Sequence, residues 1–482
     1  MQILIIANDP HDIGGVMNYT RPLASKFVEL GHSVKYLYSG TWNSKYDFRF
    51  KPYIHYNRTD FTFECAEIIN SDCLSYNYGH AELDVACPSV EKLVASHIEN
   101  TKPDVVHIHS RVGFPASINK IAFERGAAVC NTIHTYGYIC QKRVMIDRNG
   151  DPCAGPADLR KCAACTGTLD YGRERRRLLS SNYKGKLKKI SPGLFTALRK
   201  IKAHMEARGG AGVKTAARVA PGQMSDDALD RLAKRLGVRL KHSIASLNES
   251  SDRVICVSQD VRDTLKRYGV REEKMLVQHI GSVIAERQRV EERPLRRPLV
   301  LGNIGGVNHY KGTHVLLEAA ARTKNKDFIV KIFGKYDQHY VDRLRRKIDK
   351  VPVEFTGRYR PEDLPKILKQ IDVMVLPSIC NDTAPQTIFE SFSGGVPIIA
   401  SRIGGFPDFV RHDENGLLFE AGNSGDLAEK IDHLLDHPER IARYRANIPR
   451  LKTIEENARE LVSLYEGLLG RKGAANHAMR AS

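Results

Sequence analysis

Short apolar runs alternate with longer amphipathic stretches along most of this chain. In the first half the expected strands are residues 2–7, 33–38, 105–109 and 128–134, with a helix over residues 19–30. In the second half the expected strands are residues 299–304, 328–333, 353–356, 372–376 and 397–401. Strands and helices in this alternation favour parallel sheets covered by helices. We therefore predict an α/β chain built from two Rossmann-like, doubly wound domains.

The length of 482 residues allows two or three domains. We predict a first domain over residues 1–289 and a second over 290–450, with a basic, proline-marked linker at their junction. A stripe of apolar residues at helical spacing predicts a closing helix over residues 451–470. The remaining residues, 471–482, are expected to form a disordered tail.

No apolar run approaches the ~18 residues that a membrane-spanning helix needs, and no basic leader precedes the first strand. We expect a cytoplasmic protein. The net charge of +18 is concentrated in residues 171–241, which hold nineteen Lys and Arg but five Asp and Glu. Apolar residues recur there at helical spacing: Leu194, Phe195, Leu198, Ile201 and Met205.

This basic helical insert has two equally good interpretations. It suits an amphipathic helix on an anionic membrane, here the inner face of the plasma membrane. It also suits a solvated insert packed by its apolar face on the first domain. Nucleic acid ranks lower as a partner because the segment has no interleaved aromatic residues.

Residues 377–401 carry two carboxylates, Asp382 and Glu390, eight positions apart. On a helix, 1.5 Å per residue separates them by about 12 Å. That distance is too long for a close acid/base pair. The two carboxylates instead suit the binding of two parts of one long ligand.

The same segment predicts a helix start that favours phosphate. We expect the helix to begin near Thr383, with Pro385 in its first turn and Asp382 at the N-cap. The amides of Gln386 and Thr387 then point out of the helix start, where an anion is stabilised.

These residues resemble the acidic-x7-acidic signature of the retaining GT-B glycosyltransferases of family 4 (glycosyltransferase group 1), in which Glu usually comes first. The small-residue segment that follows in that family is matched by GVPIIAS at residues 395–401. The resemblance implies a GT-B fold, with an acceptor-side domain facing a nucleotide-sugar-binding domain across a cleft. It also implies that Asp382 contacts the donor sugar and that Glu390 accepts hydrogen bonds from the ribose hydroxyls.

The implied reaction moves a sugar from a nucleotide-sugar donor to a hydroxyl of a glycan or lipid-linked acceptor, in cell-surface polysaccharide biosynthesis. The anomeric configuration is retained, and no protein nucleophile is expected. The resemblance places Gly14 and Gly15 in the loop over the donor diphosphate. It places His134, at the end of a strand, against the donor sugar.

The turn at residues 302–312 resembles the family's strand-to-helix turn and makes Lys311 the expected cation for the donor phosphates. The family often has Arg where this chain has Gly306, so Arg358 or Lys335 is expected to substitute. No Asp-x-Asp pair occurs in the sequence. We therefore expect metal-independent transfer that requires no cofactor, with the leaving-group charge met by Lys311, the helix start and the glycine loop.

Four cysteines, Cys140, Cys153, Cys162 and Cys165, fall within 26 residues. Four thiolates suit tetrahedral zinc, so a structural zinc ion is the expected ligand of this cluster. Unliganded thiols, an iron–sulfur cluster and a redox pair are the alternatives. Some family 4 sequences carry a similar cysteine-rich insert, which here would shape the acceptor side.

Two other functions remain open. A GT-B nucleotide-sugar 2-epimerase would need the same donor site but no acceptor. A zinc-containing nucleic-acid-binding protein would explain the net positive charge and the cysteine cluster.

Overall fold

The computed structural model describes residues 1–12, 14–40, 51–57, 59–74, 80–169, 224–346 and 351–481, with short stretches at 177, 179–180, 191, 193–194, 196–197 and 218–219. The chain divides into two compact units. The first comprises Met1–Asp12, Val28–Asn131 and Pro156–Asp252, and the second comprises Ile13–Phe27, Thr132–Gly155 and Arg253–Ser482. The domain boundary at residues 289 and 290 stays a prediction. Most of the basic insert, including Phe195, Leu198, Ile201 and Met205, lies outside the described residues.

The first sheet has eight strands in the order β10-β9-β6-β5-β1-β2-β4-β3. Their bounds are β1 Gln2–Ala7, β2 Ser33–Ser39, β3 Tyr53–Asn57, β4 Glu64–Ile69, β5 Val105–Ile108, β6 Ala128–Ile133, β9 Arg253–Cys256 and β10 Met275–Val277. Strand β1 pairs in parallel with β2 and with β5, whereas β3 and β4 are antiparallel. The four strands expected in the first half are present as β1, β2, β5 and β6.

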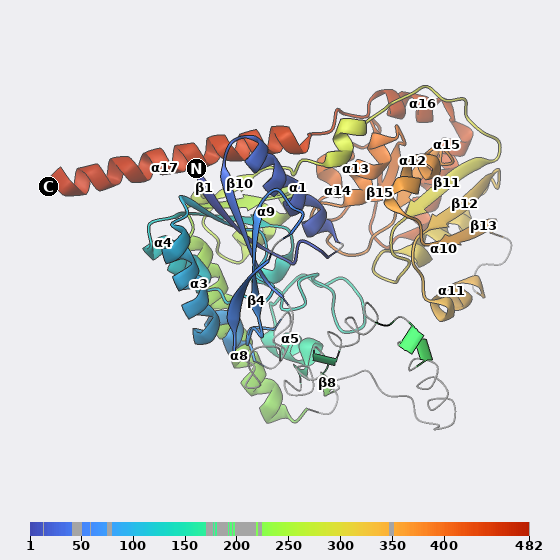
Figure 1. Ribbon diagram of the computed structural model, residues 1–482. Coiled ribbons are helices and arrows are strands. Elements are labelled where there is room, and N and C mark those ends of the chain that lie inside the picture. Colours follow the sequence, from blue (N-terminus) through green and yellow to red (C-terminus); the bar gives the residue numbers. More distant parts are fainter. Residues whose placement is uncertain are drawn as a thin grey trace. The chain divides into compact units, whose positions relative to one another are not determined.

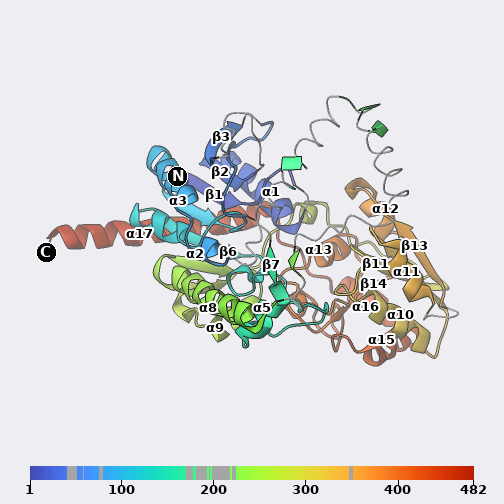
Figure 2. The ribbon, with the colours of Figure 1, turned by 90° about the horizontal axis from the view of Figure 1, so that it is seen from below.

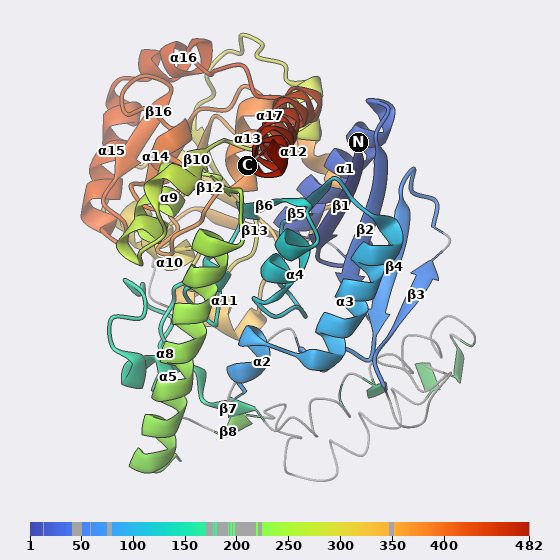
Figure 3. The same ribbon diagram turned by 90° about the vertical axis from the view of Figure 1, so that its left-hand side faces the viewer.

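Helices of the first unit pack on this sheet and on one another. They are α2 Glu82–Val85, α3 Pro88–Thr101, α4 Ile118–Glu124, α5 Leu159–Thr166 and α8 Asp226–Glu249. Helices α3 and α4 lie side by side (Figure 3). Their side chains, including Val94 and Ala122, are buried with Leu4 and Ile6 of β1. A two-stranded sheet joins β7 Thr168–Leu169 and β8 Arg218–Val219.

The described end of the basic insert forms the first half of α8, which is a packed helix. Helix α8 lies beside α5 (Figure 2). Its Leu232 and Leu236 are buried with Ala163 of α5. Arg239 of α8 forms a buried ion pair with Asp84 of α2, with 2.7 Å between Arg239 Nε and Asp84 Oδ2. Ion pairs and apolar burial therefore hold this helix within the first unit.

The second unit contains a parallel six-stranded sheet in the order β13-β12-β11-β14-β15-β16 (Figure 1). Its strands are β11 Leu299–Ile304, β12 Phe328–Phe333, β13 Val353–Gly357, β14 Val373–Leu376, β15 Ile398–Ser401 and β16 Gly416–Phe419. The five strands expected in the second half are all present, and β16 is an addition.

The helices of the second unit are α1 Gly15–Glu29, α9 Gln259–Arg267, α10 Thr313–Arg322, α11 Gln338–Arg345, α12 Leu364–Leu368, α13 Gln386–Ser393, α14 Phe406–Phe409, α15 Ser424–Asp436, α16 Glu439–Ala446 and α17 Ile454–Ala481. Short 3-10 helices span Tyr136–Tyr138, Glu272–Lys274, Val283–Arg287 and Pro361–Asp363. Within the described residues, no helix is both long enough and apolar enough to cross a bilayer.

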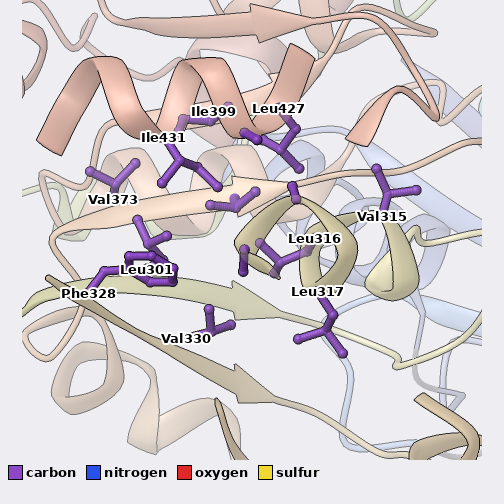
Figure 4. Close-up of a cluster of buried hydrophobic side chains, with 14 of the residues drawn as sticks. Leu301, Val315, Leu316, Leu317, Phe328, Val330, Val373, Ile399, Leu427 and Ile431 are labelled. Atoms are coloured by element: carbon purple, nitrogen blue, oxygen red, sulfur yellow. The ribbon is translucent and has the colours of Figure 1, made fainter. Parts of the chain in front are cut away.

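The core of the second unit lies between its sheet and the helices α10 and α15. Leu316 of α10 and Ile431 of α15 are fully buried with Leu301, Val373 and Ile399 of the strands (Figure 4). Strands that are buried on both faces carry continuous apolar runs, as expected for a parallel sheet. These runs explain why the strands of the second half can be predicted from the sequence.

The closing helix is longer than predicted. The capping box is present: Glu456 N–H donates to Thr453 Oγ1 at 3.1 Å, and Thr453 N–H donates to Glu456 Oε2 at 2.9 Å. The helix expected to end at Gly470 continues to Ala481 (Figure 1, red). The residues after Gly470 contain no proline and several alanines, so nothing in the sequence breaks the helix.

Asn457 of α17 joins three segments of the second unit. Its Oδ1 accepts hydrogen bonds from the Tyr19 hydroxyl of α1 at 2.8 Å and from the Gly281 amide at 3.0 Å. The Asn457 side chain is 1% exposed and Tyr19 is 4% exposed. Buried donors of this kind require an acceptor within the protein, because water cannot reach them to accept the hydrogen bond.

Replacing this acceptor should destabilise the fold. We expect Asn457→Ala to lower the free energy of unfolding by about 2 to 4 kcal/mol, since it leaves the Tyr19 hydroxyl and the Gly281 amide without their shared acceptor. Equilibrium unfolding in urea measures the change. The control, Tyr19→Phe, removes one donor and leaves the hydrogen bond between Gly281 and Asn457 intact. It should lower the free energy of unfolding by about 1 kcal/mol. Equal losses for the two variants would contradict this account.

Candidate functional site

A pocket of about 420 Å³ lies in the second unit, at the carboxyl ends of β11 and β14 and at the start of α13. In parallel α/β sheets, ligands bind at this edge. The lining residues are Gly15, Val16, His134, Thr135, Ile280, Asn303, Ile304, Gly305, Gly306, Lys311, Tyr359, Leu376, Pro377, Ser378, Asp382, Thr383, Ala384, Gln386, Thr387, Glu390 and Phe406.

The pocket brings together most of the predicted site residues. Those that line it are Gly15, His134, Lys311, Asp382, Gln386, Thr387 and Glu390. Two others are not among its lining residues: Gly14, which precedes Gly15, and Arg358, which is exposed at the end of β13. The phosphate cation that we expected in place of Gly306 is therefore not supplied to this pocket by Arg358.

The helix that follows Asp382 begins later than predicted. Pro385 is the N-cap of α13, with φ −63° and ψ 114°, and Gln386 is the first helical residue. A residue that precedes proline is disfavoured in the helical conformation, so Ala384 cannot continue a helix begun at Thr383. Asp382 consequently lies in the loop before the helix. The amides of Gln386 and Thr387 occupy the helix start as expected.

Lys311 and Asp382 form an ion pair inside the pocket. Lys311 Nζ lies 2.5 Å from Asp382 Oδ2, and the two side chains are 40% and 24% exposed. Burial alone would lower the pKa of Lys311, but the adjacent carboxylate outweighs burial and raises it. The lysine is therefore a cation over the whole physiological pH range.

A close backbone contact fixes Lys311. Gly312, the N-cap of α10, has φ +73°, and a Cβ built on it would lie 1.6 Å from the carbonyl oxygen of Pro377. Only glycine permits both this dihedral angle and this approach. The Lys311 amide also donates to Asn308 Oδ1 at 3.0 Å. The loop after β11 is thus held against the loop after β14.

Glu390 lies about one turn into α13, on the wall of the pocket. Burial raises its pKa to about 7. Tyr359 also lines the pocket, and its pKa is raised mainly by burial. The nearby charge of Glu390 raises it further. Near neutral pH, Glu390 therefore exchanges between a carboxyl that donates a hydrogen bond and a carboxylate that only accepts.

His134 is a neutral histidine in this pocket. Complete burial lowers its pKa to about 3. Its ring lies 5.2 Å from the Tyr19 ring, centroid to centroid, and its carbonyl oxygen accepts a hydrogen bond from Thr383 Oγ1 at 2.7 Å. A neutral imidazole suits hydrogen bonding to a hydroxyl, which is the role expected for His134. It does not suit a role that needs a positive charge, such as pairing with a phosphate.

Several lining residues were not predicted from the sequence. Asn303, the penultimate residue of β11, donates from Nδ2 to the Val375 carbonyl at 2.8 Å. Tyr359 lies in the loop after β13, and Phe406 begins α14 after β15. Asn303 could have been found from its position at the carboxyl end of a predicted strand. The two aromatic residues depend on loop geometry, which the pattern of apolar residues does not report.

The four clustered cysteines are divided between the two units. Cys140 and Cys153 belong to the second unit, and Cys162 and Cys165 to the first. None of the four forms a disulfide, and Cys162 packs against the apolar cluster of α5 and α8. No group of three or more His, Cys, Asp or Glu side chains suited to a metal ion occurs among the described residues. The zinc ion stays a prediction.

The second half of the chain is similar in sequence to known glycosyltransferases. Residues 285–451 match the family described as Glycosyl transferases group 1. The D-inositol 3-phosphate glycosyltransferase of Corynebacterium urealyticum is 30% identical over 183 residues, 35% of this chain and 43% of the relative. The lipopolysaccharide core biosynthesis glycosyltransferase LpsE of Rhizobium meliloti is 25% identical over 193 residues, 39% of this chain and 54% of the relative. The chain spans about half the length of the curated relatives it matches.

Solved structures share the fold over nearly the whole chain. HepE of Anabaena in complex with UDP has a TM-score of 0.55 at 14% identity and covers 100% of both chains. The lipopolysaccharide outer core galactosyltransferase WaaB has a TM-score of 0.56 at 11% identity, with 97% of this chain and 100% of that chain covered. The predicted α/β fold of the GT-B type, with two parallel sheets, is confirmed by these structures.

The raised pKa of Glu390 predicts a pH-dependent stability. Because the folded-state pKa of about 7 lies above the ordinary value of 4.5, the native state holds a proton that the unfolded state has lost between these values. The free energy of unfolding should fall as the pH rises through this range, by up to about 3 kcal/mol. Unfolding in urea between about pH 5 and pH 8 measures it, with Glu390→Gln as the variant that loses this component. Exposed Glu354→Gln should follow the wild type at every pH. If the difference in the free energy of unfolding between the wild type and Glu390→Gln does not change with pH, the pKa assigned to Glu390 is wrong.

The Gly312 contact predicts a site-specific loss of stability. Gly312→Ala should lower the free energy of unfolding by more than about 2 kcal/mol, because a methyl group must displace the Pro377 carbonyl in addition to adopting a positive φ. Gly269 separates the two effects, since its φ is +89° but no atom lies within 4 Å of the position that a Cβ would occupy. Gly269→Ala should lower the free energy of unfolding by about 1 kcal/mol. Calorimetric melting of both variants tests the prediction, which fails if they lose the same amount.

Proposed function

We propose that this chain is a retaining glycosyltransferase that moves a sugar from a nucleotide-sugar donor to a hydroxyl of a glycan or lipid-linked acceptor. The observation that carries the proposal is a single pocket that holds Lys311, the start of α13, and the carboxylates of Asp382 and Glu390. A lysine and a helix N-terminus suit a diphosphate. Carboxylates suit hydroxyl groups on either side of that diphosphate.

The similarity to known proteins supports this assignment. The match to Glycosyl transferases group 1 over residues 285–451 includes Lys311 and every pocket residue contributed by β11, β14 and α13. HepE, whose fold this chain shares, was solved with UDP. Relatives named for lipopolysaccharide core and colanic acid biosynthesis make an acceptor of the cell-surface polysaccharide class the natural proposal.

The proposed chemistry assigns a role to each group. The glycosidic bond to the diphosphate breaks, a bond to the acceptor oxygen forms on the same face, and the proton of the acceptor hydroxyl passes to the departing phosphate oxygen, so the configuration is retained. Lys311 and the start of α13 stabilise the charge that develops on the leaving diphosphate. Neutral His134 hydrogen-bonds to a sugar hydroxyl, Asp382 contacts the donor sugar, and Glu390 accepts from the ribose. The lack of an Asp-x-Asp pair in the sequence supports a metal-independent reaction.

The location of the protein is part of the proposal. The excess of positive charge in residues 171–241 supports a peripheral place at the inner face of the plasma membrane, on its cytoplasmic side. A lipid-linked acceptor would be available there.

The proposed function predicts donor binding that depends on Glu390. We expect one of UDP-, GDP- or ADP-glucose to raise the melting temperature of the wild type without added metal, and Glu390→Ala to lose this shift. At a ligand concentration 100 times Kd, the stabilisation should be about 2.7 kcal/mol. The matched control is Glu354→Ala, whose carboxylate lies outside the pocket on β13 and pairs with Lys331.

Two further results complete the test. Incubation of the stabilising nucleotide sugar with candidate acceptors should yield a glycoside whose anomeric configuration, read by proton NMR, equals that of the donor. Conversion of the donor sugar without any acceptor would instead indicate a 2-epimerase. If no nucleotide sugar stabilises the wild type, the proposed function is wrong.

A further inference from the structure

The ion pair between Lys311 and Asp382 places a carboxylate on the cation that the proposed function assigns to the donor phosphates. Lys311 Nζ and Asp382 Oδ2 are 2.5 Å apart, and both side chains line the pocket. A phosphate that approaches Lys311 must therefore approach Asp382 as well. The effect of that carboxylate depends on the charge and on the hydrogen-bond donors that the ligand brings with it.

Asp382 has little freedom to move away. Its carbonyl accepts a hydrogen bond from the Gly405 amide at 2.8 Å. A Cβ built on Gly404, whose φ is +57°, would lie 2.5 Å from the Asp382 carbonyl oxygen and 2.8 Å from its nitrogen. The loop after β15 thus packs directly on the backbone of Asp382. The main chain of Asp382 is held in place by these contacts, and the ion pair keeps its carboxylate beside Lys311.

The donor and the product of the proposed reaction differ at this position. In a nucleotide sugar the terminal phosphate is a diester-like group with one charge, and the attached sugar offers hydroxyl donors that a carboxylate accepts. After transfer the terminal phosphate is a monoester that carries nearly one more negative charge above pH 7, since its second pKa is about 6. That added charge and the Asp382 carboxylate repel each other in a partly dehydrated pocket.

We infer that Asp382 is a specificity-determining residue that selects the sugar-bearing nucleotide over the free nucleoside diphosphate. This inference rests on the proposed function and deepens it. The carboxylate competes with the terminal phosphate for Lys311, so the leaving diphosphate loses its cation once the sugar has gone. Release of the product is thereby favoured, and inhibition by accumulated nucleoside diphosphate is limited.

The inference has an unusual consequence, in which removal of a pocket residue strengthens binding. With the nucleotide that stabilises the wild type, Asp382→Asn should bind the nucleoside diphosphate at least about tenfold more tightly. Its affinity for the corresponding nucleotide sugar should stay level or fall, because the amide is a weaker acceptor for the sugar hydroxyls. Isothermal titration calorimetry at about pH 8 measures both affinities.

Matched variants separate charge from shape. Asp382→Glu keeps the charge and should keep the wild-type preference for the nucleotide sugar. Glu354→Gln removes one negative charge outside the pocket and should leave both affinities unchanged. Inorganic pyrophosphate serves as a second probe that needs no base recognition, and it should also bind Asp382→Asn more tightly. If circular dichroism shows that Asp382→Asn does not fold, Asp382→Ser replaces it, and the same changes in affinity are expected.

The possible outcomes distinguish this inference from the proposed function. If the wild type binds both ligands but the ratio of their affinities is the same in Asp382→Asn, the inference is wrong and the proposed function stands. The same conclusion follows if the variant binds the diphosphate more weakly. If the wild type binds no nucleotide or nucleotide sugar, both are wrong.

Discussion

The site depends on the close approach of the backbone at Gly312 to the carbonyl of Pro377. Parallel pairing of β11 with β14 brings the carboxyl ends of the two strands to the same edge of the sheet. The loops that leave those strands carry Lys311 and Asp382, and the main-chain contact sets how closely the two loops approach. The two side chains span the remaining gap as an ion pair, so the opposite charges are paired before any ligand arrives.

Burial decides the protonation of the other polar groups in the pocket. It raises the pKa of the Glu390 carboxyl and lowers the pKa of the His134 imidazole, so both groups shift towards their neutral forms. Lys311 is the exception because Asp382 compensates for its burial and keeps its pKa raised. The fixed electrostatic features of the pocket are therefore the ion pair and the N-terminus of α13, and the remaining groups contribute hydrogen bonds.

The parts of the fold that could be predicted are those with long apolar runs. Strands β11 and β12 have the bounds expected from their sequences because both of their faces are buried. Strand β3 was missed because Tyr53–Asn57 is half exposed and lies at a sheet edge, where the sequence is mixed. The expected start of α13 is too early because it places Pro385 inside the helix, whereas the effect of proline on the preceding residue puts Pro385 at the N-cap.

The site was predictable where a residue follows directly from its strand or helix. Lys311 belongs to the strand, loop and helix pattern of β11 and α10, and Asp382 and Glu390 belong to that of β14 and α13; the pocket contains all three. Tyr359, in the loop after β13, and Phe406, at the start of α14, enter the pocket through chain folding that no local pattern encodes. The four cysteines are close in sequence and are divided between the two units, so the zinc ion stays a prediction.

The hydrogen bonds of Asn457 have a consequence for the order in which the protein forms. Tyr19 and Asn457 are 438 positions apart, so their hydrogen bond forms only after the segment that carries Asn457 has been synthesised. Until then, the Tyr19 hydroxyl and the Gly281 amide have not met their common acceptor. The helix that carries Gly15 and the Tyr19 ring, which packs on His134, therefore gains this buried contact late. A chain that stops short of residue 457 lacks the acceptor that anchors this wall of the pocket.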